Sequence, residues 1–148
     1  MVIRQAGIED AAEIHRLLLD LAAALGKTAD IKSSVQDIRR FGFESEPHFE
    51  ALLAFENGQA VGLAVYFYEF SSWRGVPGVY LQDLYVADEM RGRGLGRDLM
   101  DAVRERGRAW GGAYVRLTLH DGNERALAFY RRLGFEARED ELPLVLRD

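Results

Sequence analysis

The stretch that decides the fold reads Val79-Tyr80-Leu81-Gln82-Asp83-Leu84-Tyr85-Val86-Ala87-Asp88-Glu89-Met90-Arg91-Gly92-Arg93-Gly94-Leu95-Gly96-Arg97-Asp98-Leu99-Met100. Its first eight residues are rich in β-branched and aromatic side chains, and apolar residues at helical spacing follow from Leu99. This pattern predicts a strand, a glycine loop and a helix. Alternating glycines bring backbone N–H groups close to a ligand, and a helix N-terminus attracts negative charge. The stretch therefore predicts a site for phosphate or pyrophosphate.

Two common phosphate-binding motifs do not fit these glycines. A Walker-type nucleotide loop requires Lys and then Ser or Thr after its last glycine, but Arg97-Asp98 stands there. A dinucleotide fingerprint requires Gly-x-Gly-x-x-Gly in the first βαβ unit, whereas Gly92, Gly94 and Gly96 alternate and lie late in the chain. On the hexapeptide alone, an arginine-rich solvated turn remains an alternative.

Composition indicates an ordinary globular chain. With 148 residues, 48% hydrophobic and 29% charged, we expect a single domain spanning residues 1–148. The longest apolar runs, Ala51–Phe55 and Val61–Tyr68, are too short to cross a bilayer, and residues 1–5 show no signal-peptide pattern. We therefore expect a cytoplasmic protein with no membrane partner.

The cysteine and histidine content and the net charge limit the chemistry available to the chain. It contains no cysteine, which excludes disulfides and cysteine nucleophiles. Its histidines, His15, His48 and His120, are widely separated, so we expect no metal site. The formal net charge of −5 argues against nucleic-acid binding and weakly favours a cationic substrate.

Hydrophobic periodicity and turn signals predict the remaining elements. Asn57-Gly58 between apolar runs predicts a hairpin, which continues into residues 79–86 as an antiparallel meander. Because a helix connects them, the strand predicted at residues 114–120 should run parallel to residues 79–86. The predicted helices are Ile8–Leu25, Ser34–Phe41, a helix ending near Trp110, and Glu124–Leu133; the other strands are Met1–Gln5, Phe49–Glu56, Gln59–Phe70, Phe135–Arg138 and Leu142–Leu146.

Two motifs in order carry a family resemblance. Arg91-x-x-Gly94-x-Gly96 is followed by Asn123-Glu124-x-Ala126-x-x-Phe129-Tyr130-x-x-x-Gly134-Phe135, and with them the whole chain resembles the GCN5-related N-acetyltransferases (GNAT). Within that family it is most similar to the diamine, or spermidine/spermine, acetyltransferases. The closer likeness lies in Asp37-x-x-x-x-Gly42-Phe43-x-x-x-Pro47, Val61-Gly62-x-Ala64-x-Tyr66, Trp73-x-Gly75 and Tyr80-Leu81-x-Asp83-x-x-Val86.

The resemblance implies an α/β (α+β) GNAT fold. Its mixed, mostly antiparallel sheet would have about six or seven strands flanked by about four helices. A splayed parallel pair, Val79–Val86 and Tyr114–His120, would hold acetyl-CoA. The implied cosubstrate is acetyl-CoA, and no metal takes part.

The resemblance also implies roles for individual residues. The loop would bind the diphosphate, the edge of residues 84–86 would pair with the pantetheine arm, and a backbone N–H of Leu84 or Tyr85 would polarise the thioester. Tyr130 would protonate the departing thiolate. The implied cofactor-binding residues are Leu84, Tyr85, Val86, Arg91, Gly92, Arg93, Gly94, Leu95, Gly96, Asn123 and Tyr130.

Several of these residues have a simpler structural interpretation. Tyr130 could be a core aromatic, and Asn123 could serve only as the N-cap of its helix. Arg93 could be a solvated loop charge instead of a phosphate ligand. Trp73 and Tyr80 could line an acceptor pocket or pack under the turn.

The chain departs from the resemblance at Gln82. The diamine acetyltransferases carry a Glu there as base, and Gln cannot accept a proton from an ammonium group. Strand alternation would place Gln82 with Tyr80 and Leu84, and Asp83 with Leu81 and Tyr85. The candidate bases that remain are Glu69, Asp83, His120 and water held by Gln82. Gln82 and Tyr130 are the candidate catalytic residues, and Gln82, Asp83, Trp73 and Tyr80 the candidate acceptor-binding residues.

The resemblance therefore implies an acetyl-CoA-dependent N-acetyltransferase for a primary amine of a small molecule, either diamine-like or an amino acid amine. Two alternatives remain open: a catalytically weak acyl-CoA sensor, motivated by Gln82, and an acetyltransferase for a protein Lys or N-terminus. A homodimer formed through the residues after Gly134 is also expected from the resemblance.

Overall fold

The computed structural model describes all 148 residues. They form two compact units, Met1–Leu117 and Thr118–Asp148. The larger unit contains the sheet and the first three α-helices, and the smaller contains the last helix and the C-terminal segment. The expectation of one domain over residues 1–148 stays a prediction.

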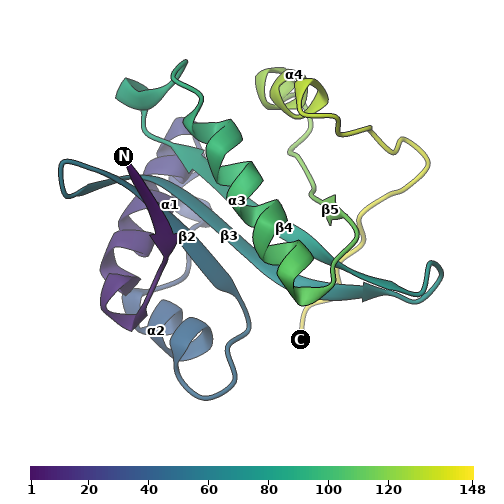
Figure 1. Ribbon diagram of the computed structural model, residues 1–148, viewed down its shortest axis with the longest axis horizontal. Coiled ribbons are helices and arrows are strands. Elements are labelled where there is room, and N and C mark those ends of the chain that lie inside the picture. The colour runs from purple at the N-terminus through teal and green to yellow at the C-terminus, as the bar shows by residue number, and fades with distance from the viewer. The chain divides into compact units, whose positions relative to one another are not determined.

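One five-stranded sheet, in the order β1-β2-β3-β4-β5, forms the centre of the larger unit (Figure 1). Neighbouring strands are antiparallel from β1 to β4, whereas β5 runs parallel to β4. The predicted meander and the predicted parallel pair are thus confirmed. Asn57 and Gly58, with φ of 52° and 78°, form the predicted hairpin turn. The strands are β1 (Val2–Gln5), β2 (Glu50–Glu56), β3 (Gln59–Ser71), β4 (Val76–Val86) and β5 (Val115–Arg116).

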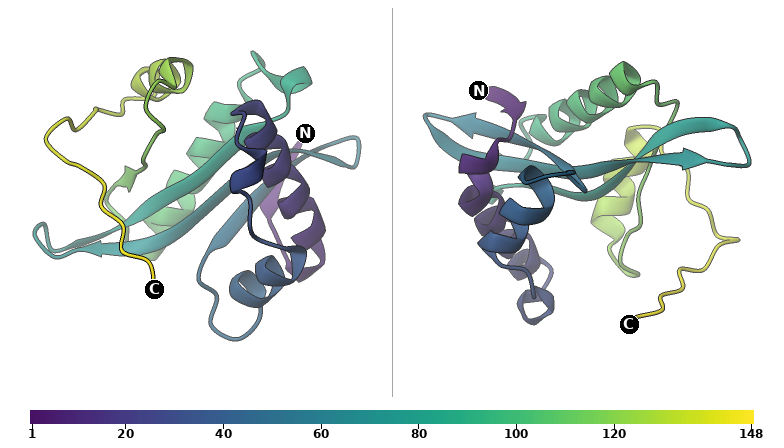
Figure 2. Two further views of the ribbon diagram at one scale, coloured as in Figure 1. Left: turned by 180° about the vertical axis from the view of Figure 1, so that it is seen from behind. Right: turned by 90° about the horizontal axis from the view of Figure 1, so that it is seen from below.

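Helices cover both faces of this sheet. Figure 2 shows α1 (Ala11–Ala24) and α2 (Val35–Phe43) on one face and α3 (Leu95–Trp110) on the other. A short 3-10 turn at Ile8–Asp10 leads into α1. The first turn of α2 is closed by a capping box, in which Ser34 accepts from the Asp37 N–H and Asp37 from the Ser34 N–H.

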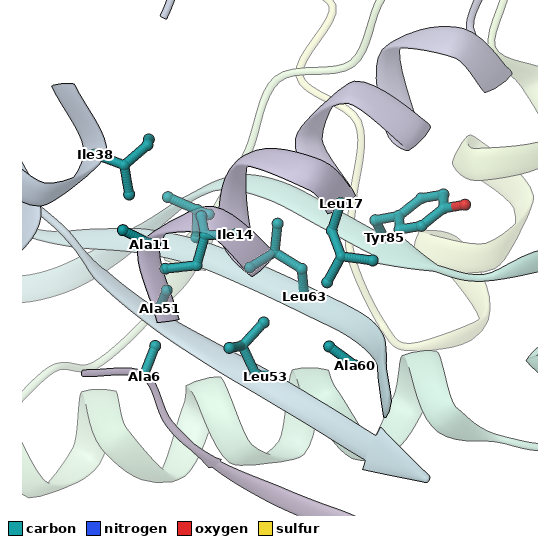
Figure 3. Packing of buried hydrophobic residues seen from close by; sticks show 11 residues of the cluster. Ala6, Ala11, Ile14, Leu17, Ile38, Ala51, Leu53, Ala60, Leu63 and Tyr85 are labelled. Atoms are coloured by element: carbon teal, nitrogen blue, oxygen red, sulfur yellow. The ribbon is translucent and has the colours of Figure 1, made fainter. Parts of the chain in front are cut away.

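The core on the α1 face is built from alternating strand residues and one helical stripe. Ile14 and Leu17 of α1 pack against Leu53 and Leu63 of the sheet, and all four are essentially inaccessible (Figure 3). Tyr85 projects from β4 into the same cluster. On the opposite face, α3 buries an apolar stripe that consists of Leu95, Leu99, Met100 and Val103. Strand β4 is therefore covered on both sides and provides a rigid platform for the loop that follows it.

The smaller unit contains α4 (Glu124–Arg132), close to its predicted range. The Asn123 side chain accepts a hydrogen bond from the Ala126 N–H at 3.3 Å, as an N-cap does. None of the helices combines the length and apolar character needed to span a membrane.

Three strand predictions need correction. The strand expected at Tyr114–His120 is only two residues long, Val115–Arg116, and no strand forms at Phe135–Arg138 or Leu142–Leu146. The sheet therefore has five strands, not the six or seven expected. A β-prone sequence becomes a strand only where another strand pairs with it, and these segments have no such partner within the chain.

Candidate active site

The glycine loop has the backbone geometry that its sequence predicts. It follows β4 and a 3-10 turn at Asp88–Met90 and leads directly into α3. Gly94 is the N-cap of α3 and has a φ of 82°, a left-handed conformation that side-chain-bearing residues avoid. The first N–H groups of α3 have no carbonyl partner within the helix. They therefore present positively polarised donors at the C-terminal end of β4, as the predicted phosphate site requires.

The loop arginines are held by neighbouring acceptors. Arg91 pairs with Asp88 at 3.2 Å, and Arg93 pairs with Glu56 at 3.2 Å and contacts the Met90 sulfur. Arg97, in the first turn of α3, is exposed and makes neither an ion pair nor a side-chain hydrogen bond. The sequence interpretation overlooked Arg97, although its place one residue after the last loop glycine was a signal. A diphosphate could engage Arg97 without breaking an existing ion pair.

Strand β4 has an unpaired edge directly before the loop. It pairs with β5 only at Val79 and Tyr80, opposite Val115 and Arg116, and then continues to Val86 without a partner on that side. This is the predicted separation of the parallel pair, except that β5 is shorter than expected. Backbone groups at residues 81–86 are thus available to pair with an extended, amide-containing ligand.

A β-bulge at Gln82 changes which residues share a face. Val65 lies opposite Asp83, and Tyr66 lies opposite Leu81, so Gln82 is the extra residue of β4. Because Val65 and Tyr66 point to opposite faces of β3, Asp83 and Leu81 also point to opposite faces of β4. The alternation expected from the sequence is therefore wrong across the bulge.

The corrected faces place the candidate acceptor residues differently. Tyr80 stands opposite Phe67, on the same face of β3 as Val65, so Tyr80 and Asp83 share the face covered by α1. Leu84 stands opposite Ala64 and faces the other side, together with Leu81. Gln82, expected beside Tyr80 and Leu84, is exposed at the bulge.

The Asp83 carboxylate is partly buried and has no partner. It makes no hydrogen bond and no ion pair. Burial alone raises the pKa of Asp83 from 3.8 to about 6, because a desolvated carboxylate is less stable when charged. A carboxylate with that pKa, beside an open strand edge, can accept a proton near neutral pH or bind a cation.

The other candidate bases have different surroundings. Glu69 accepts hydrogen bonds from Arg116 at 2.6 and 2.9 Å and from Tyr114 at 2.7 Å. The Arg116 hydrogen bonds lower its pKa, which makes it a weaker proton acceptor. His120 is exposed in the smaller unit. Among the carboxylates proposed from the sequence, only Asp83 is unpaired.

Tyr80 and Trp73 lie in unlike surroundings. The Tyr80 ring stacks on Phe67, with centroids 5.1 Å apart, and the Arg116 guanidinium lies 4.6 Å from its centroid. Trp73 is fully exposed at the tip of the β3–β4 hairpin, so the alternative in which it packs under the turn is wrong. A role in acceptor binding stays a prediction for both residues.

Tyr130 and Asn123 belong to the smaller unit. Tyr130 is buried, with edge-on ring contacts to Phe129 at 5.1 Å and Phe135 at 5.4 Å. Asn123 caps α4, as described above. The structural interpretations of both residues are therefore correct, and their cofactor roles stay predictions. The two kinds of role are compatible.

A shallow depression elsewhere in the larger unit contains none of the predicted site residues. It lies between α1 and the β2–β3 hairpin, and its lining consists of Glu13, Arg16, Phe55, Gly58, Gln59 and Ala60. Arg16 is tied there to Glu13 at 2.8 Å and to the Ala60 carbonyl at 3.0 Å. Its charged groups already have partners within the chain.

Comparisons with known proteins agree with this geometry. The family model described as "Acetyltransferase (GNAT) family" matches residues 13–135. Thialysine N-epsilon-acetyltransferase of Bos taurus is 32% identical over 142 residues, covering 90% of this chain and 83% of that protein. Spermidine/spermine N(1)-acetyltransferase-like protein 1 of Homo sapiens is 34% identical over 110 residues, covering 70% of this chain and 16% of that protein.

The fold is also found among solved structures. A tetramutant of the BH1408 protein from Bacillus halodurans superimposes with a TM-score of 0.81 and 25% identity, covering 99% of this chain and all of that chain. The family match extends over both glycine-loop and α4 motifs, and the two relatives confirm the closer likeness to the diamine-type enzymes. The chain therefore belongs to the GNAT acetyltransferase family, whose members use acetyl-CoA, and is an N-acetyltransferase.

Proposed function

We propose that this N-acetyltransferase moves an acetyl group from acetyl-CoA directly to a primary amine of a small molecule, such as a diamine or an amino acid side chain. The observation that carries the proposal is the unpaired Asp83 carboxylate beside the open edge of β4. The Bos taurus relative is a thialysine N-epsilon-acetyltransferase, and this activity supports an acceptor of this kind.

The cosubstrate would be held by backbone groups more than by side chains. The N–H groups of residues 94–96 and the Arg97 guanidinium would bind the diphosphate. The edge of β4 at Leu84–Val86 would pair with the amides of the pantetheine arm, and an N–H of Leu84 or Tyr85 would polarise the thioester carbonyl. Asn123 would make a further contact with the cosubstrate.

Asp83 would take the role that Gln82 cannot fill. An alkyl ammonium has a pKa of about 10.4, so an acceptor amine arrives protonated. Transfer of its proton to Asp83, whose pKa is about 6, costs about 6 kcal/mol for the difference of about four pKa units. That cost fits within the barrier of about 16 kcal/mol that corresponds to a turnover of about 10 per second. Gln82 would bind the amine or an intervening water.

The reaction then balances without an acyl-enzyme. The neutral amine attacks the thioester carbonyl carbon, and a C–N bond forms to give a tetrahedral intermediate. Its collapse breaks the C–S bond and releases the CoA thiolate. One proton of the ammonium goes to Asp83 before attack, and the thiolate takes a proton from the Tyr130 hydroxyl. The second proton, still on the nitrogen after attack, passes through water to the Tyr130 phenolate and restores its hydroxyl.

The direct test is release of free CoA from acetyl-CoA in the presence of single amines. We expect turnover with diamines or with amino acids that carry a side-chain amine, and mass spectrometry should find one added acetyl group. Lysine peptides and intact proteins serve as the comparison set. Bound CoA without turnover of any amine would contradict the proposal and favour a sensor, whereas preference for peptides would favour a protein acetyltransferase.

Replacing Tyr130 by Phe is expected to lower kcat by about tenfold. This effect is smaller than the usual contribution of a general acid, about 100-fold or more, because a thiol with a pKa near about 8.5 leaves partly unaided at neutral pH. The loss of kcat in Tyr130→Phe should become smaller as the pH rises toward the pKa of the thiol. Steady-state kinetics between pH 6 and 9 provide the measurement, with Phe129→Leu in the same helix as the packing control. An unchanged kcat for Tyr130→Phe would leave this tyrosine a purely structural role.

We also propose a homodimer formed through the C-terminal segment. Leu142, Leu144, Val145 and Leu146 are 85, 91, 70 and 94% exposed, and their β-prone sequence lacks a strand partner. Pairing with a second copy would bury these side chains and satisfy the backbone. Cytoplasmic location and an absence of nucleic-acid or membrane partners remain part of the proposal.

Removal of residues 140–148 is expected to convert a dimer into a monomer. Light scattering after size-exclusion chromatography measures the mass directly, against 16.7 kDa for one chain. Phe70→Ser, which removes an exposed aromatic of the β3–β4 hairpin that is 64% accessible, is the control and should leave the mass unchanged. A full-length monomer, or a truncated dimer, would refute this interface.

A further inference from the structure

The parallel strands β4 and β5 separate at one defined rung. Their ladder consists of Val79 opposite Val115 and Tyr80 opposite Arg116, after which β4 continues alone to Val86. Each backbone hydrogen bond contributes a net of only about 1 kcal/mol. Two rungs are therefore a weak attachment, and side chains must determine where the strands part.

The last rung carries a row of stacked side chains. Phe67, Tyr80 and Arg116 stand directly opposite one another across β3, β4 and β5. The Phe67 and Tyr80 rings are stacked at 5.1 Å with 23° between their planes, and the Arg116 guanidinium carbon lies 4.6 Å from the Tyr80 centroid. Stacking and the cation–π contact hold the Tyr80 side chain from both neighbouring strands.

Glu69 ties β5 to β3 across the intervening strand. The Arg116 guanidinium donates to both Glu69 oxygens, at 2.6 and 2.9 Å, and the Tyr114 hydroxyl donates to Oε2 at 2.7 Å. A bidentate guanidinium–carboxylate pair restricts geometry more than a single contact does. The Glu69 side chain is only 19% exposed, so water competes weakly for it.

Gly78 makes this crossing possible. It lies opposite Glu69 on β4, and a Cβ added there would lie 2.2 to 2.5 Å from three atoms of the Tyr114 ring. The ring therefore lies against the backbone of β4, and any side chain at position 78 would displace it. The absence of a Cβ at Gly78 is what lets Tyr114 reach Glu69.

We propose that Glu69, Tyr114 and Arg116, together called the vertex clamp, are positioning residues that set where β4 and β5 separate. Through that separation they determine where a bound acyl group lies relative to Asp83, three residues beyond Tyr80. None of the three touches reacting atoms. The inference rests on the proposed function, because it assumes that the acyl chain enters the splay.

Misplacement of reacting atoms by about 1 Å can reduce a rate by about 100-fold. Glu69→Gln removes the ionic part of the clamp without changing its size, and Gly78→Ala displaces Tyr114 without changing any charge. Both variants should lower kcat for amine acetylation by about tenfold or more. The calorimetric Kd for CoA should change by less than about twofold, because the diphosphate loop is unaltered. Tyr114→Phe should fall between these variants and the native chain.

Selectivity between acyl-CoA substrates distinguishes a positioning role of the vertex clamp from a general loss of stability. Weakening the vertex clamp should raise kcat/KM for butanoyl-CoA relative to acetyl-CoA. General destabilisation should instead lower the kcat/KM values for the two acyl-CoA substrates in proportion. Arg104→Gln is the matched control, because it removes an exposed pair with Asp101 at 3.8 Å on the surface of α3. That variant should retain native kcat and selectivity.

Hydrogen exchange provides a readout that does not depend on activity. The Val79 N–H donates to the Tyr114 carbonyl at 3.0 Å, and its exchange should accelerate in Glu69→Gln and Gly78→Ala but not in Arg104→Gln. If the native chain acetylates no amine, the proposed function fails. Exchange of the Val79 N–H still tests whether the vertex clamp holds β5 against β4. Unchanged exchange, or unchanged kcat and selectivity in an active enzyme, would overturn the inference.

Discussion

Replacing Asp83 by Asn is expected to lower kcat/KM for the acceptor amine by about 100-fold or more, the usual contribution of a general base. Asn preserves the size of the side chain but can accept no proton from an ammonium group. If Asp83 also binds the cationic acceptor, KM rises as well. Steady-state kinetics with acetyl-CoA at saturation measure the change. Asp101→Asn, which neutralises an exposed carboxylate of α3, is the control and should retain native rates.

The same substitution should change the pH dependence of the rate. Burial raises the pKa of Asp83 to about 6, so the native chain should gain activity as pH rises through about 6, where the carboxylate loses its proton. That acidic limb should disappear in Asp83→Asn. A limb that persists in the variant would assign the titration to another group and remove Asp83 from the role of base.

Stability should change in the opposite direction to activity. The pKa of Asp83 is about 6 in the folded chain, against an ordinary value of 3.8, so the unfolded chain binds fewer protons between these values. Folding stability contributed by this group therefore falls as pH rises from about 4 to about 6. Above that range, Asp83→Asn should be more stable than the native chain by up to about 3 kcal/mol, which corresponds to two pKa units. Denaturant titrations at pH 4 and pH 8 provide the comparison, since the difference should vanish at the lower value.

Gly94→Val is expected to weaken CoA binding by about 30-fold. Gly94 has a φ of 82°, and a β-branched residue in that conformation costs about 2 kcal/mol. In the free variant the loop should relax and turn the N–H groups of residues 95 and 96 away from the ligand. Binding must then restore the left-handed conformation, and a cost of about 2 kcal/mol corresponds to about 30-fold in Kd. Isothermal calorimetry with CoA measures the difference.

Gly58→Val is the matched control for this experiment. Gly58 has a φ of 78°, and a Cβ meets nothing within 4 Å at either position. Both substitutions therefore introduce similar backbone strain and a similar loss of stability, but only Gly94 lies in the loop. Equal Kd values for Gly94→Val and the native chain would place the diphosphate elsewhere on the molecule.

Local patterns predicted most of the secondary structure correctly. The stripe of Ile14 and Leu17 predicted the first helix, Asn57-Gly58 the hairpin, and the glycine loop the start of the helix after β4. These signals work because neighbouring residues alone determine them. Residues 135–138 and 142–146 failed because a strand needs a second strand, and no strand of this chain pairs with them.

The candidate site was predictable in its loop but not in its strand. The left-handed Gly94 and the helix start follow from residue type and order, so sequence alone indicated the anion site. The bulge at Gln82 depends on how β3 and β4 align over their whole length. Period-two alternation holds on either side of the bulge but not across it. It therefore wrongly placed Leu81 and Asp83 on the same face of β4.

The sequence by itself determined the order of elements, the glycine loop at the end of the central strand and the family, because each depends on local pattern or on motifs in series. Only the tertiary structure decided which carboxylate stands free. Glu69 pairs with Arg116 and Tyr114 across three strands, and Asp83 turns into the α1 face at the bulge, where burial raises its pKa. Pairing and desolvation arise between residues far apart in the chain, so residue type and spacing cannot specify them.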